Sequence, residues 1–128
     1  MSETAVFTRY LESMLRVGQA NPERARLAIR AREDQVMAAL RDALRSGTRD
    51  SERTVALIDF YMHVTLQMLY DAAQIGDRLE FAEAEMKAWA VAGALDRAAN
   101  AVEARDRDTV VAAMLAAESV LGINLSSA

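Results

Sequence analysis

The chain's single histidine, His63, follows an acidic residue, Asp59, by four positions. Side chains at this spacing share one face of a helix, and a carboxylate that orients an imidazole is a device for proton transfer. The same pair can also be structural, because a carboxylate stabilises a partly buried imidazole. The sequence identifies no nucleophile beside the pair, so we assign no catalytic residue and leave both interpretations open.

The pair belongs to the most apolar stretch of the chain, residues 54–75, in which fifteen of twenty-two residues are apolar and none is Lys or Arg. On a helix its main polar side chains fall within one arc of about 120°. This polar seam consists of Asp59, His63, Gln67, Asp71 and Gln74. A helix that is apolar over the rest of its circumference must be covered on several sides, so the pattern predicts the central helix of a bundle.

Polar groups buried without partners are costly, so we expect at least Asp59 or Asp71 to pair with an arginine or to face solvent. Tyr61 and Tyr70 lie on the same stretch and are further candidates for a ligand or partner site at the seam. With neighbouring methionines they could line a pocket for a flat ligand such as a tetrapyrrole. Such residues at helical spacing more often form a core, and we expect no cofactor.

Composition narrows the function classes. The chain has 128 residues, which suits a single domain over 1–128, and its net charge of −4 argues against a nucleic-acid binder. The absence of cysteine excludes thiol catalysis and thiolate metal sites. Acidic residues near 80–85 fall on different faces of a helix start, so no metal site is predicted. No signal peptide or membrane-spanning segment is evident, and a cytoplasmic location is the default expectation.

Five glycines and one proline divide the chain into helices. The predicted helices cover about 4–17, 22–45, 54–75, 78–104 and 109–121. Gly18, Ser46-Gly47, Gly76 and Gly122 are predicted to end helices, whereas Asn21, Asp50, Asp77 and Asp106 are predicted to cap their starts. The fold class is therefore all-α, a single-domain antiparallel bundle of about five helices with a four-helix core plus an N-terminal helix. Gly93, inside a helix, is expected to permit a close helix crossing.

The first predicted helix carries Phe7, Tyr10 and Met14 at helical spacing, and these are candidates for an interaction surface if that helix can detach. Together with an alanine-rich helix near 78–104, they offer more apolar surface than a small bundle easily hides. We therefore expect a homodimer, since two-fold pairing is the commonest closed assembly.

Two segments resemble the flagellar export chaperones of the small helical-bundle type. The hexapeptide MLYDAA at 68–73 is similar to the MLYDGA-like hexapeptide of that family, which lies near the family's start, and the alanine-rich hairpin at 95–121 is similar to its central hairpin. The two segments cover under a third of the chain. The resemblance implies binding of a helical protein tail through grooves on the bundle.

These observations predict a non-enzymatic α-helical interaction protein, an adaptor, chaperone or regulator that binds a partner helix or itself through an apolar groove. The alternative is a small-ligand-binding or catalytic bundle that uses the polar seam around His63. Another protein or a second copy is the expected partner, with neither nucleic acid nor membrane involved.

Overall fold

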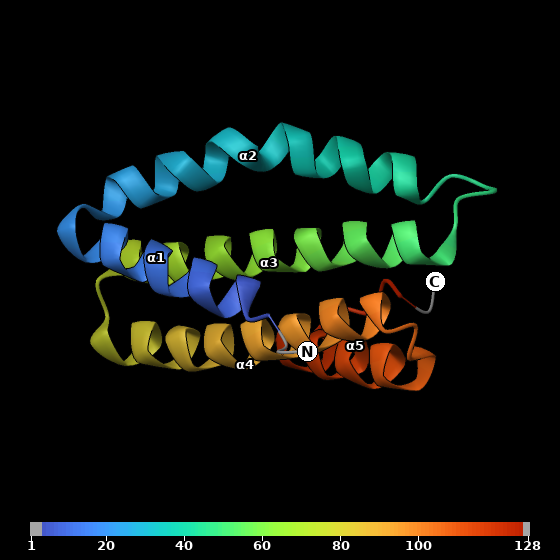
Figure 1. The fold of residues 1–128 in the computed structure, drawn as a ribbon. Coiled ribbons are helices and arrows are strands. Elements are labelled where there is room, and N and C mark those ends of the chain that lie inside the picture. Colours follow the sequence, from blue (N-terminus) through green and yellow to red (C-terminus); the bar gives the residue numbers. More distant parts are fainter. Residues whose placement is uncertain (1–3, 127–128) are drawn as a thin grey trace.

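The computed structural model describes residues 4–126, and in this part of the chain every regular element is a helix, as the sequence predicts (Figure 1). The helices are α1 (Val6–Ala20), α2 (Pro22–Ala43), α3 (Asp50–Ile75), α4 (Arg78–Glu103) and α5 (Arg107–Leu121). No helix among residues 4–126 is long and apolar enough to cross a membrane.

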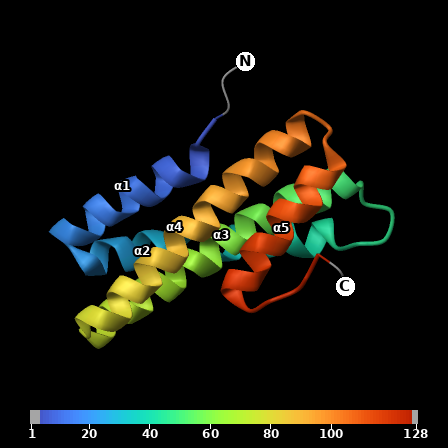
Figure 2. The same cartoon turned by 90° about the horizontal axis from the view of Figure 1, so that it is seen from below.

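The central position predicted for α3 is confirmed. It packs between α2 and α4 and also touches α5, while α1 and α5 lie on either side of α4 (Figures 1 and 2). Leu57, Ile58, Tyr61, Leu66 and Leu69 of α3 are among the most deeply buried large side chains. The helix predicted as an addition to a four-helix core belongs to the core itself, because Leu11 of α1 is fully buried.

Local capping chemistry sets most helix boundaries. The side chain of Asn21 accepts a hydrogen bond from the Arg24 amide at 3.2 Å, and Asp77 accepts one from the Leu79 amide at 2.8 Å. Asp106 caps α5 in the same way. At Asp50 the prediction was wrong: α3 begins at Asp50 itself, and no side chain caps this helix start. Asp50 instead places negative charge in the first turn, at the positive end of the helix dipole.

Gly18 does not end a helix, contrary to the prediction. Helix α1 continues to Ala20, and Gly18 is buried within it because the ring of Tyr70 from α3 packs directly against its backbone. A Cβ atom at Gly18 would lie 2.1 Å from the Tyr70 hydroxyl oxygen. The missing side chain allows that hydroxyl to donate a hydrogen bond to the Met14 carbonyl at 2.6 Å.

The second glycine prediction, a close crossing at Gly93, was also wrong. A Cβ atom at this position would meet only the guanidinium of Arg97, at an ordinary contact distance of 3.7 Å. The bulk of the neighbouring helices therefore lies away from Gly93.

The start of α1 is held by a side chain from α4. Asp96, only 8% exposed, accepts hydrogen bonds from the Phe7 amide at 2.7 Å and from the Thr8 amide at 3.1 Å. It also accepts one from the Thr8 hydroxyl at 2.5 Å. The residue that precedes α1, Ala5, has no side chain that can do this. Asp96 thus performs from another helix the task of an N-cap residue.

Candidate functional site

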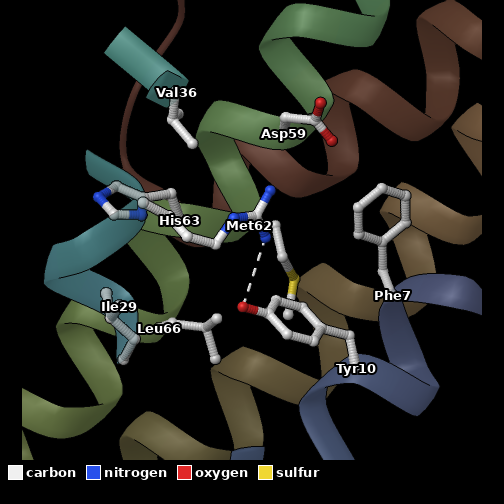
Figure 3. Close-up of a pocket in the computed structure, with 9 residues that line it drawn as sticks. Phe7, Tyr10, Ile29, Val36, Asp59, Met62, His63 and Leu66 are labelled. Carbon is white, nitrogen blue, oxygen red and sulfur yellow. Dashed lines mark hydrogen bonds between the residues drawn. The ribbon is translucent and has the colours of Figure 1, made fainter. Parts of the chain in front are cut away.

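Four of the five residues of the polar seam line two hollows between α3 and α2, whereas Gln74 is exposed and lines neither. Asp59 and His63 line a small cavity with Arg32 of α2 and Tyr10 of α1 (Figure 3). Further along α3, Gln67, Tyr70 and Asp71 line a second, more open hollow of about 220 Å³ with charged residues of both signs from α2. Asp59 and Asp71 are both exposed, which confirms that at least one of them faces solvent.

Asp59 and His63 share the cavity, yet they do not form a carboxylate–imidazole pair. The imidazole lies on the side of Ile29 and Val36, whereas the carboxylate of Asp59 turns toward Phe7 (Figure 3). The Nε2 atom of His63 is buried and has no hydrogen-bond partner within the described chain. The relay needed for proton transfer is therefore not assembled in this conformation.

Burial favours the neutral forms of both the His63 imidazole and the Asp59 carboxyl group. Burial lowers the pKa of His63; Glu33 opposes this shift, while Arg32 adds to it. Partial burial of its carboxyl raises the pKa of Asp59, and Arg32 counteracts part of the increase. Arg32 itself donates a hydrogen bond to the Tyr10 hydroxyl at 3.4 Å and lies over the Tyr10 ring. Arg32 therefore joins α1, α2 and the seam.

The size of this cavity limits what it can hold. Its volume is about 30 Å³, which is room for about two water molecules. Water suits the surroundings, because the Nε2 atom of His63 needs a partner and other polar groups line the same space. An organic ligand, and above all a tetrapyrrole, requires several hundred cubic ångströms. The cavity in this conformation thus fits water.

The side chains predicted as an interaction surface on α1 pack inward. Met14 is 6% exposed, and Phe7 and Tyr10 are partly buried against the core. They would become available to a partner only if α1 left the bundle. The hydrogen bonds that Asp96 accepts from the start of α1, and the one that Tyr70 donates to Met14, oppose such a departure.

Tyr61 lies apart from the other predicted seam residues. Its hydroxyl donates a hydrogen bond to Glu118 of α5, on the side of α3 away from α2. Burial, together with the Glu118 carboxyl, raises the pKa of Tyr61. The sequence did not single out Glu118, which is 3% exposed although it is a charged residue type.

A groove with both apolar and polar walls runs between the first half of α3 and α5, beside the last turn of α4, and it has a volume of about 780 Å³. Leu57 of α3 and Met114 of α5 lie along it, while Val111 and Leu115 on its α5 side are about half exposed, at 52% and 51%. Its end near the α4–α5 turn carries mixed charges, Asp50, Arg53, Arg105, Asp106 and Arg107. We call this feature the α3–α5 groove.

Beyond its first two residues, Arg107 and Asp108, the outer face of α5 beside this groove is uncharged. Between residues 109 and 121 the single charged residue is Glu118, and it is buried. The exposed positions there include Val111, Ala112, Leu115, Ala116 and Ser119. This surface was missed as a candidate site, although the run of uncharged residues is visible in the sequence.

Among residues 4–126 no group of three or more His, Asp or Glu side chains is placed to hold a metal ion. No protein-family model, curated protein or solved structure matches the chain. The hexapeptide at 68–73 lies on α3, where Leu69 and Tyr70 are core residues. In this fold the hexapeptide joins α3 to α1 through the contact between Tyr70 and Met14.

Proposed function

We propose that this protein is a non-enzymatic α-helical interaction protein that binds a partner helix, or a second copy of itself, through the α3–α5 groove and the outer face of α5. The observation that carries the proposal is the absence of any exposed charge on α5 between residues 109 and 121. A helix that faces water normally carries charged residues on its outer side, and one that is uncharged all round is usually covered.

The shape beside α5 supports the same proposal. The half-exposed side chains of Val111 and Leu115 form an edge, and the groove lies next to them. An amphipathic helix can lay its apolar side chains into such a groove. Two copies related by a two-fold axis can also place the edge of each α5 in the groove of the other, so a homodimer is the form we propose first.

Site-specific photo-crosslinking tests the proposal. A photo-reactive amino acid replaces Leu115 in one version of the protein and Leu27, which is 55% exposed on α2, in a control version. We expect crosslinks at position 115, either between copies of the purified protein or to one defined partner in lysate, and none at position 27. Equal labelling at the two positions, or none at 115 in either setting, would refute the proposal.

The matched substitutions Leu115→Asp and Leu27→Asp extend this test to light scattering. If the protein is a dimer, Leu115→Asp should shift it to the monomer mass, whereas Leu27→Asp should leave the mass unchanged. A monomeric mass for the parent protein at micromolar concentration would refute the homodimer and leave a different protein as the partner.

The second candidate function is a small-ligand-binding or catalytic bundle that uses the seam around His63. One observation favours it: the buried Nε2 atom of His63 has no hydrogen-bond partner among residues 4–126. The cavity volume of about 30 Å³ and the separation of the imidazole from Asp59 favour structural water instead. Loss of function in His63→Gln with an unchanged fold would reverse this preference.

A further inference from the structure

The segment after α5 turns back along the bundle instead of leaving it (Figure 2). Gly122, in the left-handed conformation, ends α5. Ile123 and Leu125 then pack, partly buried, against the core. Ser126 reaches the buried carboxyl group of Glu118, one helical turn beyond Met114 on α5.

Glu118 is satisfied entirely by neutral donors. The Ser126 amide donates to its Oε2 atom at 2.9 Å, and the Ser126 hydroxyl donates to its Oε1 atom at 2.7 Å. The Tyr61 hydroxyl supplies the third hydrogen bond. No Lys or Arg in residues 4–126 forms a salt bridge with Glu118. A buried carboxyl that loses its donors is costly, so any chain that replaces residues 123–126 must bring donors of its own.

The hydrogen bonds around Glu118 adjoin the α3–α5 groove through Ser126. Tyr61 lies one helical turn beyond Leu57 on α3, as Glu118 does beyond Met114 on α5, and Ser126 itself lines the groove. Residues 123–126 therefore pack beside the groove, where α3 and α5 continue past Leu57 and Met114, while the part beside Leu57 and Met114 stays open. We call the place that Ser126 fills against Tyr61 and Glu118 the Glu118 subsite.

The geometry points to the Glu118 subsite as a peptide-binding subsite that residues 123–126 occupy in place of a partner. The segment of the partner that enters this subsite is extended and has two apolar residues in alternate positions, followed by serine or threonine. This inference deepens the proposed function and rests on it, because the partner uses the same groove. Binding of the partner and seating of residues 123–126 exclude each other.

The choice of serine or threonine follows from the two hydrogen bonds. A single residue supplies both its backbone N–H and a hydroxyl to the two oxygen atoms of one carboxyl group. Alanine would supply only the N–H, and proline would supply neither. The alternate contacts of Ile123 and Leu125 match an extended backbone, in which every second side chain points to the same face.

A synthetic peptide with the sequence of residues 122–128 is the probe, titrated into the full chain and followed by NMR. The parent chain is compared with Ser126→Ala, which removes one donor, and with Ser126→Pro, which removes both. Ser13→Ala, at an exposed position on α1, is the matched control. Circular dichroism and the melting temperature of each variant show whether its bundle is intact.

We expect the peptide to bind Ser126→Pro about tenfold more tightly than the parent, because the parent must first release its own segment. Ser126→Ala should fall between the two, and Ser13→Ala should match the parent. A peptide with alanine in place of its first serine should bind about tenfold more weakly. Equal affinity for parent and Ser126→Pro, no binding to a folded Ser126→Pro, or equal affinity of the two peptides would overturn the inference.

Failure here can be separated from failure of the proposed function. If the peptide does not bind while crosslinks still form at position 115, the groove binds a partner without using the Glu118 subsite. If crosslinks at position 115 are also missing, the proposed function fails as well.

Discussion

Replacing Gly18 by alanine tests how α1 is held against α3. In an ordinary helix interior this substitution stabilises a protein, because alanine has the higher helix propensity by about 1 kcal/mol. At Gly18 the new methyl group would lie 2.1 Å from the Tyr70 hydroxyl oxygen and 2.5 Å from the ring atom Cε1. Tyr70 is 3% exposed, so its ring has little room to move.

The magnitude follows from three contributions. Overpacking in a close-packed core costs about 1–3 kcal/mol. Displacing the Tyr70 ring also weakens its hydrogen bond to the Met14 carbonyl, which adds about 1 kcal/mol. The propensity gain offsets about 1 kcal/mol of this. We therefore expect Gly18→Ala to lower the free energy of unfolding by about 1–3 kcal/mol.

Gly93→Ala is the matched control, since it makes the same chemical change inside α4. A Cβ atom there meets only Arg97 at 3.7 Å, so this variant should be more stable than the parent by up to about 1 kcal/mol. Urea unfolding followed by circular dichroism measures both variants. The opposite signs are the critical result: if Gly18→Ala stabilises the protein as Gly93→Ala does, the packing of Tyr70 on α1 is not as described.

Two further predictions concern single side chains. Asp96→Ala removes the acceptor for the first amides of α1, so it should destabilise the protein by about 2 kcal/mol and speed hydrogen exchange at Thr8; unchanged exchange there would contradict the capping role. Because burial lowers the pKa of His63, the unfolded chain binds that proton more readily. Above the ordinary histidine pKa of about 6.5, His63 is neutral in the folded and the unfolded chain, and its contribution to the free energy of unfolding is complete. As the pH falls below that value, the unfolded chain takes up the proton first, and the protein loses this part of its stability. Urea unfolding at several pH values should show that acid lowers the free energy of unfolding less in His63→Gln than in the parent protein. An identical pH dependence of the two proteins would refute this assignment. If the seam is only structural, the same variant at neutral pH should change stability by about 1 kcal/mol or less and keep partner binding.

Features fixed by neighbouring residues were predictable from the sequence. Asn21 and Asp77 accept hydrogen bonds from amides two or three positions ahead, so their side-chain type and place relative to an apolar run are enough. The apolar circumference of residues 54–75 likewise predicted a helix covered on several sides, and α3 is that helix. Both inferences need only local geometry and periodicity.

Features fixed by distant residues were not predictable in the same way. Glycine is a residue type that commonly ends helices, so the sequence alone suggests that role for Gly18. Only the position of the Tyr70 ring shows that Gly18 lies inside α1 as the contact between α1 and α3. Asp96 and Glu118 look like ordinary surface acids until the amides and hydroxyls that surround them are placed. The seam residues share one arc of α3, but the side chains of α1 and α2 decide what each of them meets, such as Arg32 and Tyr10 beside Asp59 and His63.

The capping of α1 by Asp96 has a consequence for synthesis of the chain. Phe7 and Asp96 are 89 residues apart, so the first turn of α1 leaves the ribosome long before the side chain that secures it. At about 5–20 residues per second, the interval is roughly 4–18 s. During that time the apolar face of α1 has neither its cap nor α4 to pack against. A nascent chain shortened before Asp96 should therefore expose α1 to protease, and extension beyond α4 should protect it.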